Sequence, residues 1–155
     1  MKILALDMAT KTGWAISGSP VVSGVQVFDV KRGESPGMRF LRFHAWLSEV
    51  VTLAGGVKVI VFEQAHHRGG AATQACVGMV THALSFAAKH NIETMPVHSK
   101  TLKKWATGKG NAKKEDMVKA ACTFGYSPAD DNEADALLLL EYACRELGVI
   151  IKKRG

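Results

Sequence analysis

The sequence lacks any hydrophobic run long enough to cross a membrane. Its longest purely apolar runs, at 59–62 and 136–140, fall far short of the roughly 20 residues that a spanning helix needs. The N-terminus reaches an acid, Asp7, after a short apolar stretch, whereas a signal peptide needs a longer apolar core and a small-residue cleavage site. We therefore expect a cytoplasmic protein with no membrane partner.

Cysteine is also scarce. The three cysteines, Cys76, Cys122 and Cys144, are odd in number and their spacing fits neither a zinc ribbon nor a redox pair. All three lie in apolar stretches of expected helix, so we expect buried free thiols in a reducing compartment. No Ser, Cys or Tyr stands in a recognisable nucleophile motif, which argues against a covalent intermediate.

Positive charge, in contrast, is in excess. The 155 residues include 47% hydrophobic and 22% charged ones, the balance of one globular domain spanning 1–155, and the formal net charge is +6. Six lysines fall between Lys100 and Lys114. Gly108 and Gly110 in this segment would allow a close approach of the backbone, so the segment either contacts phosphates or is a solvated face. The expected DNA-binding lysines are Lys103, Lys104, Lys109, Lys113 and Lys114.

Hydrophobic periodicity predicts three strands, a helix, a strand, a helix, a strand and then further helices. The expected strands are 2–7, 13–17, 21–30, 57–62 and 92–97, the first three as an antiparallel meander. The expected helices are 38–53, 71–90, about 100–106, 113–124 and about 128–147. Ser127 could cap the last helix, with Pro128 at its first position. This order is that of the RNase H-like α/β fold, a five-stranded mixed sheet with the meander and two parallel strands, flanked by helices.

Three acidic positions stand where separate elements could bring them together. Asp7 ends the first strand and Glu63 the fourth, so both carboxylates face one crevice if these strands are parallel neighbours. At the start of the last helix, either Asp131 or Asn132 shares a face with Asp135. Each acid alone is more readily a solvated turn or first-turn residue, but a buried Asp135 would need a partner or a metal. Oxygen ligands without a Cys or His cluster are typical of a Mg²⁺ or Mn²⁺ site.

Four segments resemble motifs of the RuvC family of Holliday-junction resolvases, in the family's order and over nearly the whole chain. They are Ile3-Leu4-Ala5-Leu6-Asp7 with Thr12-Gly13-Trp14-Ala15, then Val59-Ile60-Val61-Phe62-Glu63-Gln64, the basic stretch 97–114, and Asn132-Glu133-Ala134-Asp135-Ala136-Leu137. The resemblance implies a homodimeric nuclease that nicks four-way DNA junctions with Mg²⁺ or Mn²⁺, two ions per site, and no nucleotide cofactor. Asp7, Glu63 and Asp135 carry over as metal ligands, and Lys103 and Lys114 as functional lysines.

In the mechanism this implies, one ion held by Asp7 and the C-terminal acids would activate water. A second ion, shared by Asp7 and Glu63, would stabilise the leaving 3′-oxygen. Lys114 would support the scissile phosphate. A two-fold dimer would place one site at each strand of a symmetric junction, and the small and apolar helix at 71–88 is the expected interface.

Two departures from the family pattern leave questions open. The family usually has Asp or His three residues before the final Asp, where this chain has Asn132 with Asp131 just before it; charge favours Asp131. The loop after Glu63 lacks the aromatic residue often found there, and offers His66, His67 and Arg68 as DNA contacts, the histidines also as metal ligands, unless the loop is merely solvated. A phage-type enzyme that cuts forks or flaps, and a binding module that does not cut, are therefore alternatives.

Overall fold

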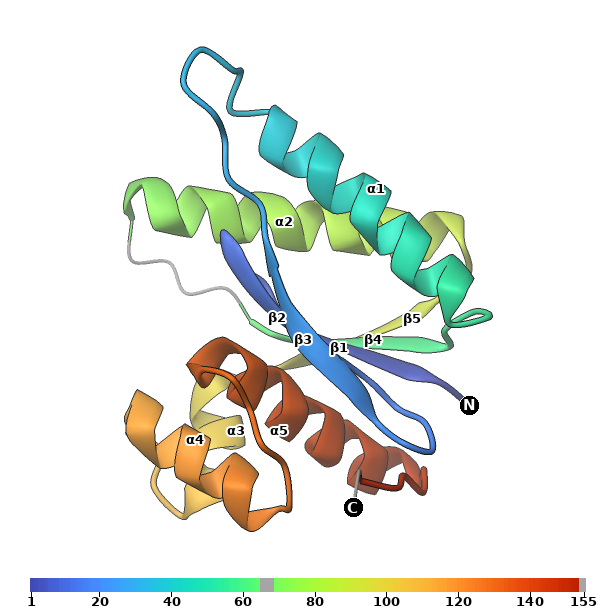
Figure 1. Ribbon diagram of the computed structural model, residues 1–155, viewed down its shortest axis with the longest axis vertical. Helices are drawn as coiled ribbons and strands as arrows, with labels where there is room; N and C mark the ends of the chain where they lie inside the picture. The colour runs from blue at the N-terminus through green and yellow to red at the C-terminus, as the bar shows by residue number, and fades with distance from the viewer. Residues whose placement is uncertain (65–68, 154–155) are drawn as a thin grey trace.

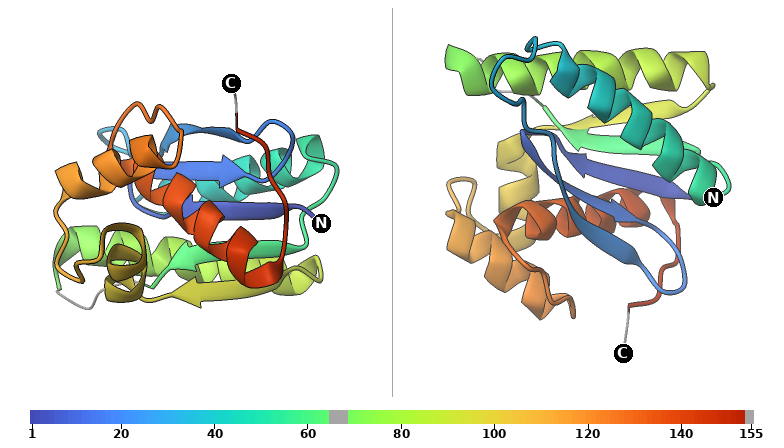
Figure 2. Two further views of the ribbon diagram at one scale, coloured as in Figure 1. Left: turned by 90° about the horizontal axis from the view of Figure 1, so that it is seen from below. Right: turned by 45° about the horizontal axis from the view of Figure 1, so that its top comes forward.

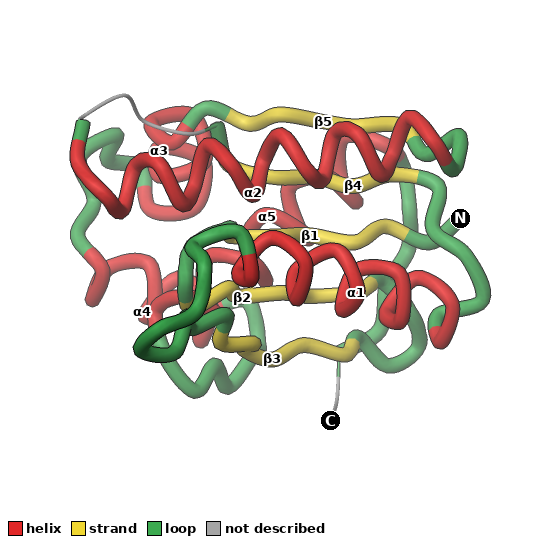
Figure 3. The backbone as a smooth tube through the Cα atoms, turned by 90° about the horizontal axis from the view of Figure 1, so that it is seen from above, coloured by secondary structure: helices red, strands yellow, loops and turns green. Residues whose placement is uncertain are grey.

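The computed structural model describes residues 1–64 and 69–153. Its sheet has five strands in the order β3-β2-β1-β4-β5 (Figure 3). The strands are β1 (Ile3–Asp7), β2 (Lys11–Ile16), β3 (Val22–Val27), β4 (Val59–Glu63) and β5 (Glu93–Val97). β1 pairs antiparallel with β2 and β2 with β3, whereas β1, β4 and β5 run parallel. The predicted meander with two parallel strands is confirmed.

Helices cover both faces of the sheet (Figures 1 and 2). α1 (Met38–Leu53) and α2 (Gly70–Lys89) lie on one face; α3 (Ser99–Thr107), α4 (Lys114–Thr123) and α5 (Asp131–Leu147) lie on the other. Central β1 has apolar side chains on both faces: Leu4 and Leu6 pack with the α1–α2 layer, and Ile3 and Ala5 with the α3–α5 layer. This explains why β1 and β4 are continuous apolar runs rather than alternating ones.

The structure corrects two local expectations. The last helix begins at Asp131 and its N-cap is Asp130, whose carboxylate accepts a hydrogen bond from the Glu133 N–H at 2.9 Å, so Ser127 does not cap it. Asp is as good a cap as Ser, and it is nearer the first periodic apolar residue. All three thiols are free, but only Cys144 is buried; Cys76 is half-buried and Cys122 is exposed on α4. No helix among the described residues is both long and apolar enough to cross a membrane.

Candidate metal centre

Two parallel neighbouring strands bring Asp7 and Glu63 together. Leu6 of β1 stands opposite Phe62 of β4 in the register, so the acid that ends each strand emerges at the same edge of the sheet. The turn that follows Asp7 is fixed by Thr12, whose buried hydroxyl donates a hydrogen bond to the carbonyl oxygen of Ala9 at 2.6 Å. The two half-buried carboxylates therefore lie together at the carboxyl ends of β1 and β4, as the sequence predicts.

Asp135 reaches the same place from α5. Its neighbours Ala134 and Ala136 are fully buried, so this helix turn packs directly onto the sheet. One carboxylate oxygen each from Asp7, Glu63 and Asp135 lies within 4.8 Å of the other two. Three acids from three separate elements thus meet in one cluster.

The cluster is electrostatically unfavourable in the absence of a cation. Burial raises the pKa of Asp7 well above its ordinary value, and the charges of Asp135 and Glu63 raise it further. The pKa of Asp135 is raised to about 7, first by burial and then by the charges of Glu63 and Asp131. The buried Oδ1 of Asp135 has no hydrogen-bond partner among the described residues. This oxygen belongs to a carboxylate that lies beside two others. A bound divalent cation would provide the partner that the oxygen lacks and would offset the repulsion among the three acids.

The two candidates for a fourth ligand lie differently. Asp131 acts by its charge on both Asp7 and Asp135, which places its carboxylate beside the cluster. The Asn132 amide instead donates to Asp130 Oδ2 at 3.5 Å, and Asp130 is itself paired with Lys11 at 3.0 Å. In this conformation Asp131 is therefore the better placed of the two.

Two of the predicted lysines lie beside the acids. Lys103 on α3 and Lys114, the first residue of α4, both lower the pKa of Asp135 by their charge. The Lys114 ammonium is 3.8 Å from Asp131 Oδ2 and its side chain is 84% exposed, so it is free to exchange this partner for another anion. The other predicted DNA-contacting lysines, Lys104, Lys109 and Lys113, are all exposed.

The α3–α4 segment is held against α5 by aromatic packing. The Trp105 ring stacks on Phe124 with centroids 5.2 Å apart and meets Tyr142 of α5 edge-on at 5.4 Å. Trp105 is thus a packing residue of its helix, and the lysines on either side of it are carried on a fixed support.

The remaining predicted contacts, His66, His67 and Arg68, lie outside the described residues. Sequence reasoning also missed a residue at the cluster. The half-buried Cys76 on α2 lies close enough to Asp7 and Glu63 for their charges to raise its thiol pKa, after the larger effect of burial. No sequence motif marks Cys76; only the placement of α2 next to the ends of β1 and β4 could have found it.

Comparison with known proteins begins with negative results: no protein-family model and no curated protein sequence matches the chain. Solved structures do match. The RuvC structure from Thermus thermophilus superposes with a TM-score of 0.75, covering 97% of this chain and 99% of that one at 19% sequence identity. The chain has the fold of RuvC.

A second match is T. thermophilus RuvC in complex with a Holliday junction substrate, with a TM-score of 0.77 and 19% identity over 97% of this chain and 98% of that one. The RuvC fold therefore accounts for the whole described sheet and both helical layers, and the predicted RNase H-like architecture is confirmed. At this identity the likeness establishes the fold; activity has to be argued from the site.

Proposed function

We propose that the protein is a metal-dependent endonuclease that cleaves branched DNA by hydrolysis of a phosphodiester bond. Its preferred substrate would be the four-way junction. The observation that carries this proposal is the cluster of Asp7, Glu63 and Asp135, in which the buried Oδ1 of Asp135 has no hydrogen-bond partner within residues 1–64 and 69–153. A protein that only bound DNA would gain nothing from three converging acids, because they repel phosphate. The RuvC fold, which one solved neighbour uses on a Holliday junction, supports the choice of substrate.

The donor set fits Mg²⁺ or Mn²⁺. All three converging ligands are carboxylates, and Asp131 stands next to them, which suits a hard cation and not one that prefers sulfur or nitrogen. Bound here, one or two such ions would supply Lewis-acid activation of water and stabilisation of a leaving oxygen. The protein itself would hold the carboxylates in a partly buried crevice. Their close approach is repulsive unless a cation is bound between them.

The lysines would hold the substrate. Lys103 and Lys114 act by their charge on Asp135 from α3 and α4, which lie on the face of the sheet opposite α2 (Figure 1). A phosphate brought to the cluster would meet both ammonium groups, and Lys114 could leave Asp131 to pair with it. The positive charge of this segment would offset the repulsion between DNA and the acids.

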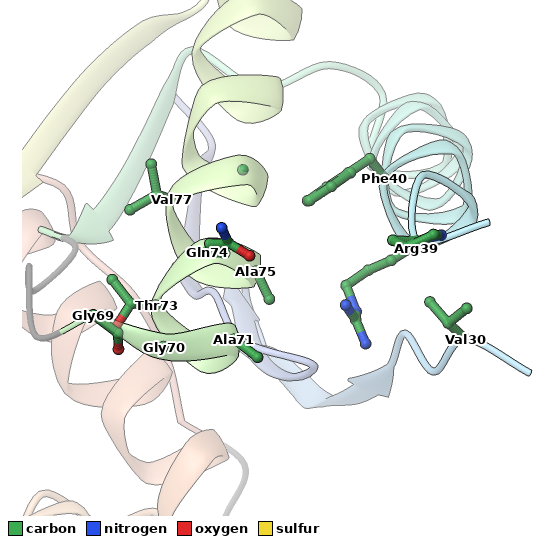
Figure 4. A pocket seen from close by; sticks show the side chains of 12 residues that line it. Val30, Arg39, Phe40, Gly69, Gly70, Ala71, Thr73, Gln74, Ala75 and Val77 are labelled. Carbon is green, nitrogen blue, oxygen red and sulfur yellow. The ribbon is translucent and has the colours of Figure 1, made fainter.

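We further propose that the protein acts as a homodimer through α2. The α2 helix keeps Val77 and Val80 partly exposed and Leu84 42% exposed, although its other side is buried against the sheet. Beside it, a cavity of about 860 Å³ separates its first turns from Phe40 and Arg39 of α1 (Figure 4). Gly78 lines this cavity but packs closely against α1, since a Cβ there would collide with the Phe40 ring.

Sedimentation of the wild type and of Val77→Glu tests the dimer. We expect a species near twice 16.7 kDa for the wild type and a folded monomer for the variant. A charge at Val77 would have to be buried in the interface, which is costly without a partner. Gly78→Arg is unsuitable because it would disrupt the α1–α2 contact within one chain. A monomeric wild type at micromolar concentration would rule the dimer out.

Cleavage of a substrate panel tests the nuclease. A mobile four-way junction, a fork, a flap and linear duplex are each incubated with Mg²⁺, Mn²⁺ or chelator, using wild type and Asp7→Asn. We expect metal-dependent incision of the four-way junction that Asp7→Asn abolishes. Faster cutting of forks or flaps would move the substrate to the broader branched class. Junction binding without cutting in either metal would leave only a binding module.

A further inference from the structure

The backbone of α5 packs closely against the sheet at Gly13 of β2. A Cβ built on Gly13 of β2 would lie 1.9 Å from the carbonyl oxygen of Asn132, 2.3 Å from its carbonyl carbon and 3.0 Å from the Glu133 nitrogen. All three are main-chain atoms, which no side-chain rotation can move away. The first turn of α5 therefore rests directly on β2, and only glycine leaves room for it.

Both partners in this contact are neighbours of acids in the cluster. Gly13 stands opposite Asp7 in the β1–β2 register, so the glycine is the cross-strand neighbour of one acid. The peptide that rests on it lies in the same helical turn as Asp131 and one turn before Asp135. The depth to which α5 settles on Gly13 thus sets how far Asp131 and Asp135 stand from Asp7.

Polar tethers hold α5 down onto this seat. Glu133 accepts a hydrogen bond from the Ser23 hydroxyl of β3 at 2.7 Å and another from the Ala129 N–H at 2.7 Å. Asp130, the N-cap, pairs with Lys11 of β2 at 3.0 Å. The contacts with Ser23 and Lys11 hold the helix against the sheet despite the repulsion among the carboxylates.

We propose that Gly13 is a positioning residue for the metal centre: its bare Cα lets α5 settle on β2, and this contact brings the α5 acids within ligand distance of Asp7. The inference rests on the proposed metal site and adds to it a residue that touches neither metal nor DNA. A methyl group at Gly13 would require α5 to retreat by about 1.5 Å to reach an ordinary C···O contact. The carboxylate of Asp135 would retreat with it.

The test is Mn²⁺ binding measured by calorimetry on wild type, Gly13→Ala and Gly24→Ala. Gly24 is a matched control, since it lies on the adjacent strand and the three atoms nearest to a Cβ there all belong to the Trp14 side chain, the closest at 3.0 Å. We expect Gly13→Ala to lose about ten- to a hundredfold in Mn²⁺ affinity, the range for removing an orienting contact of a metal ligand. Gly24→Ala should keep wild-type affinity. Equal affinity in Gly13→Ala and Gly24→Ala would overturn the proposal.

A compensating substitution separates displacement of the acid from general damage. In Gly13→Ala/Asp135→Glu, the extra methylene carries the carboxylate about as far forward as the helix has moved back, since one C–C bond is about 1.5 Å long. We expect the double variant to bind Mn²⁺ more tightly than Gly13→Ala alone, although Asp135→Glu by itself weakens binding. Absence of any recovery would mean that the methyl group acts by general disruption.

If Gly13→Ala does not fold, Glu133→Ala tests the same seat by removing its tether to Ser23. A fall in Mn²⁺ affinity with retained helical circular dichroism supports the proposal, and unchanged affinity contradicts it. The outcomes also separate this inference from the proposed function. Wild-type protein that binds no Mn²⁺ would refute the metal centre itself, whereas Mn²⁺ binding without junction cleavage would refute only the nuclease.

Discussion

Replacing one acid of the cluster should make the metal-free protein more stable. The pKa of Asp135 rises from 3.8 to about 7 on folding because burial and the charges of Glu63 and Asp131 disfavour its ionised form. One pKa unit corresponds to about 1.4 kcal/mol, so the ionised Asp135 costs the folded state about 4 kcal/mol at pH 8. Asparagine has the same shape without the charge. Asp135→Asn should therefore gain up to about 4 kcal/mol at that pH.

The direction of the Asp135 pKa shift determines the pH range over which the stability changes. The folded-state pKa of Asp135 lies above the unfolded one, so this group's contribution to stability is fully present below about pH 4 and is lost as the pH rises toward 7. Between pH 5 and pH 8 the metal-free wild type should lose about 2–3 kcal/mol from Asp135. Asp135→Asn should show a much smaller loss over the same range.

The assay is urea unfolding in chelator, followed by tryptophan fluorescence at several pH values. Asp29→Asn is the matched control, because Asp29 is exposed in the connection between β3 and α1; its curve should follow the wild type. Saturating Mg²⁺ should restore stability to the wild type at pH 8 and add little to Asp135→Asn. A variant less stable than wild type at pH 8 in chelator would refute the electrostatic reasoning, since it would mean that Asp135 is satisfied without a cation.

Three further outcomes follow from the site. Asp7→Asn and Glu63→Gln should each abolish cleavage yet leave junction binding intact or tighter in a gel-shift assay, and wild-type cutting by the Asp7 variant would end the metal proposal. Lys103→Ala should lower the log–log salt slope of junction binding by about 0.9, as loss of one phosphate contact does; an unchanged titration would make Lys103 a bystander. Asp131→Asn should cripple cleavage and Asn132→Ala should be mild, and the reverse order would make the amide the fourth ligand.

Those parts of the site that depend on strand ends could be predicted from the sequence. Asp7 and Glu63 each follow a continuous apolar run, and parallel neighbouring strands place their ends at one edge. Asp135 was accessible in the same way, because the apolar residues around it mark an inward-facing helix turn. These signals are local, and the fold only has to align them.

What could not be predicted depends on contacts between distant elements. The choice between Asp131 and Asn132 turns on where α5 starts and how it rests on Gly13, a contact between residues more than a hundred positions apart. The sequence suggests a larger exposed apolar face on α2 than the structure has, because the Phe40 ring of α1 packs against Gly78. Cys122 lies on the exposed side of its helix, which apolar neighbours alone do not reveal.

Two carboxylates on α5, those of Glu141 and Asp135, differ in how their buried oxygens are partnered. Buried Glu141 is fully partnered, accepting from the Tyr126 hydroxyl at 2.7 Å and lying 3.1 Å from the Lys153 ammonium and 3.7 Å from Arg145. Asp135, less than two turns earlier on the same helix, has a buried oxygen that accepts no hydrogen bond from the part of the chain that the structure describes. Glu141 is thus neutralised by direct contacts that tie α5 to the C-terminal segment, whereas the charges of Lys103 and Lys114 offset the raised pKa of Asp135 only in part. A fold that satisfies one buried carboxylate and leaves the other facing two more acids is prepared for a cation at the second.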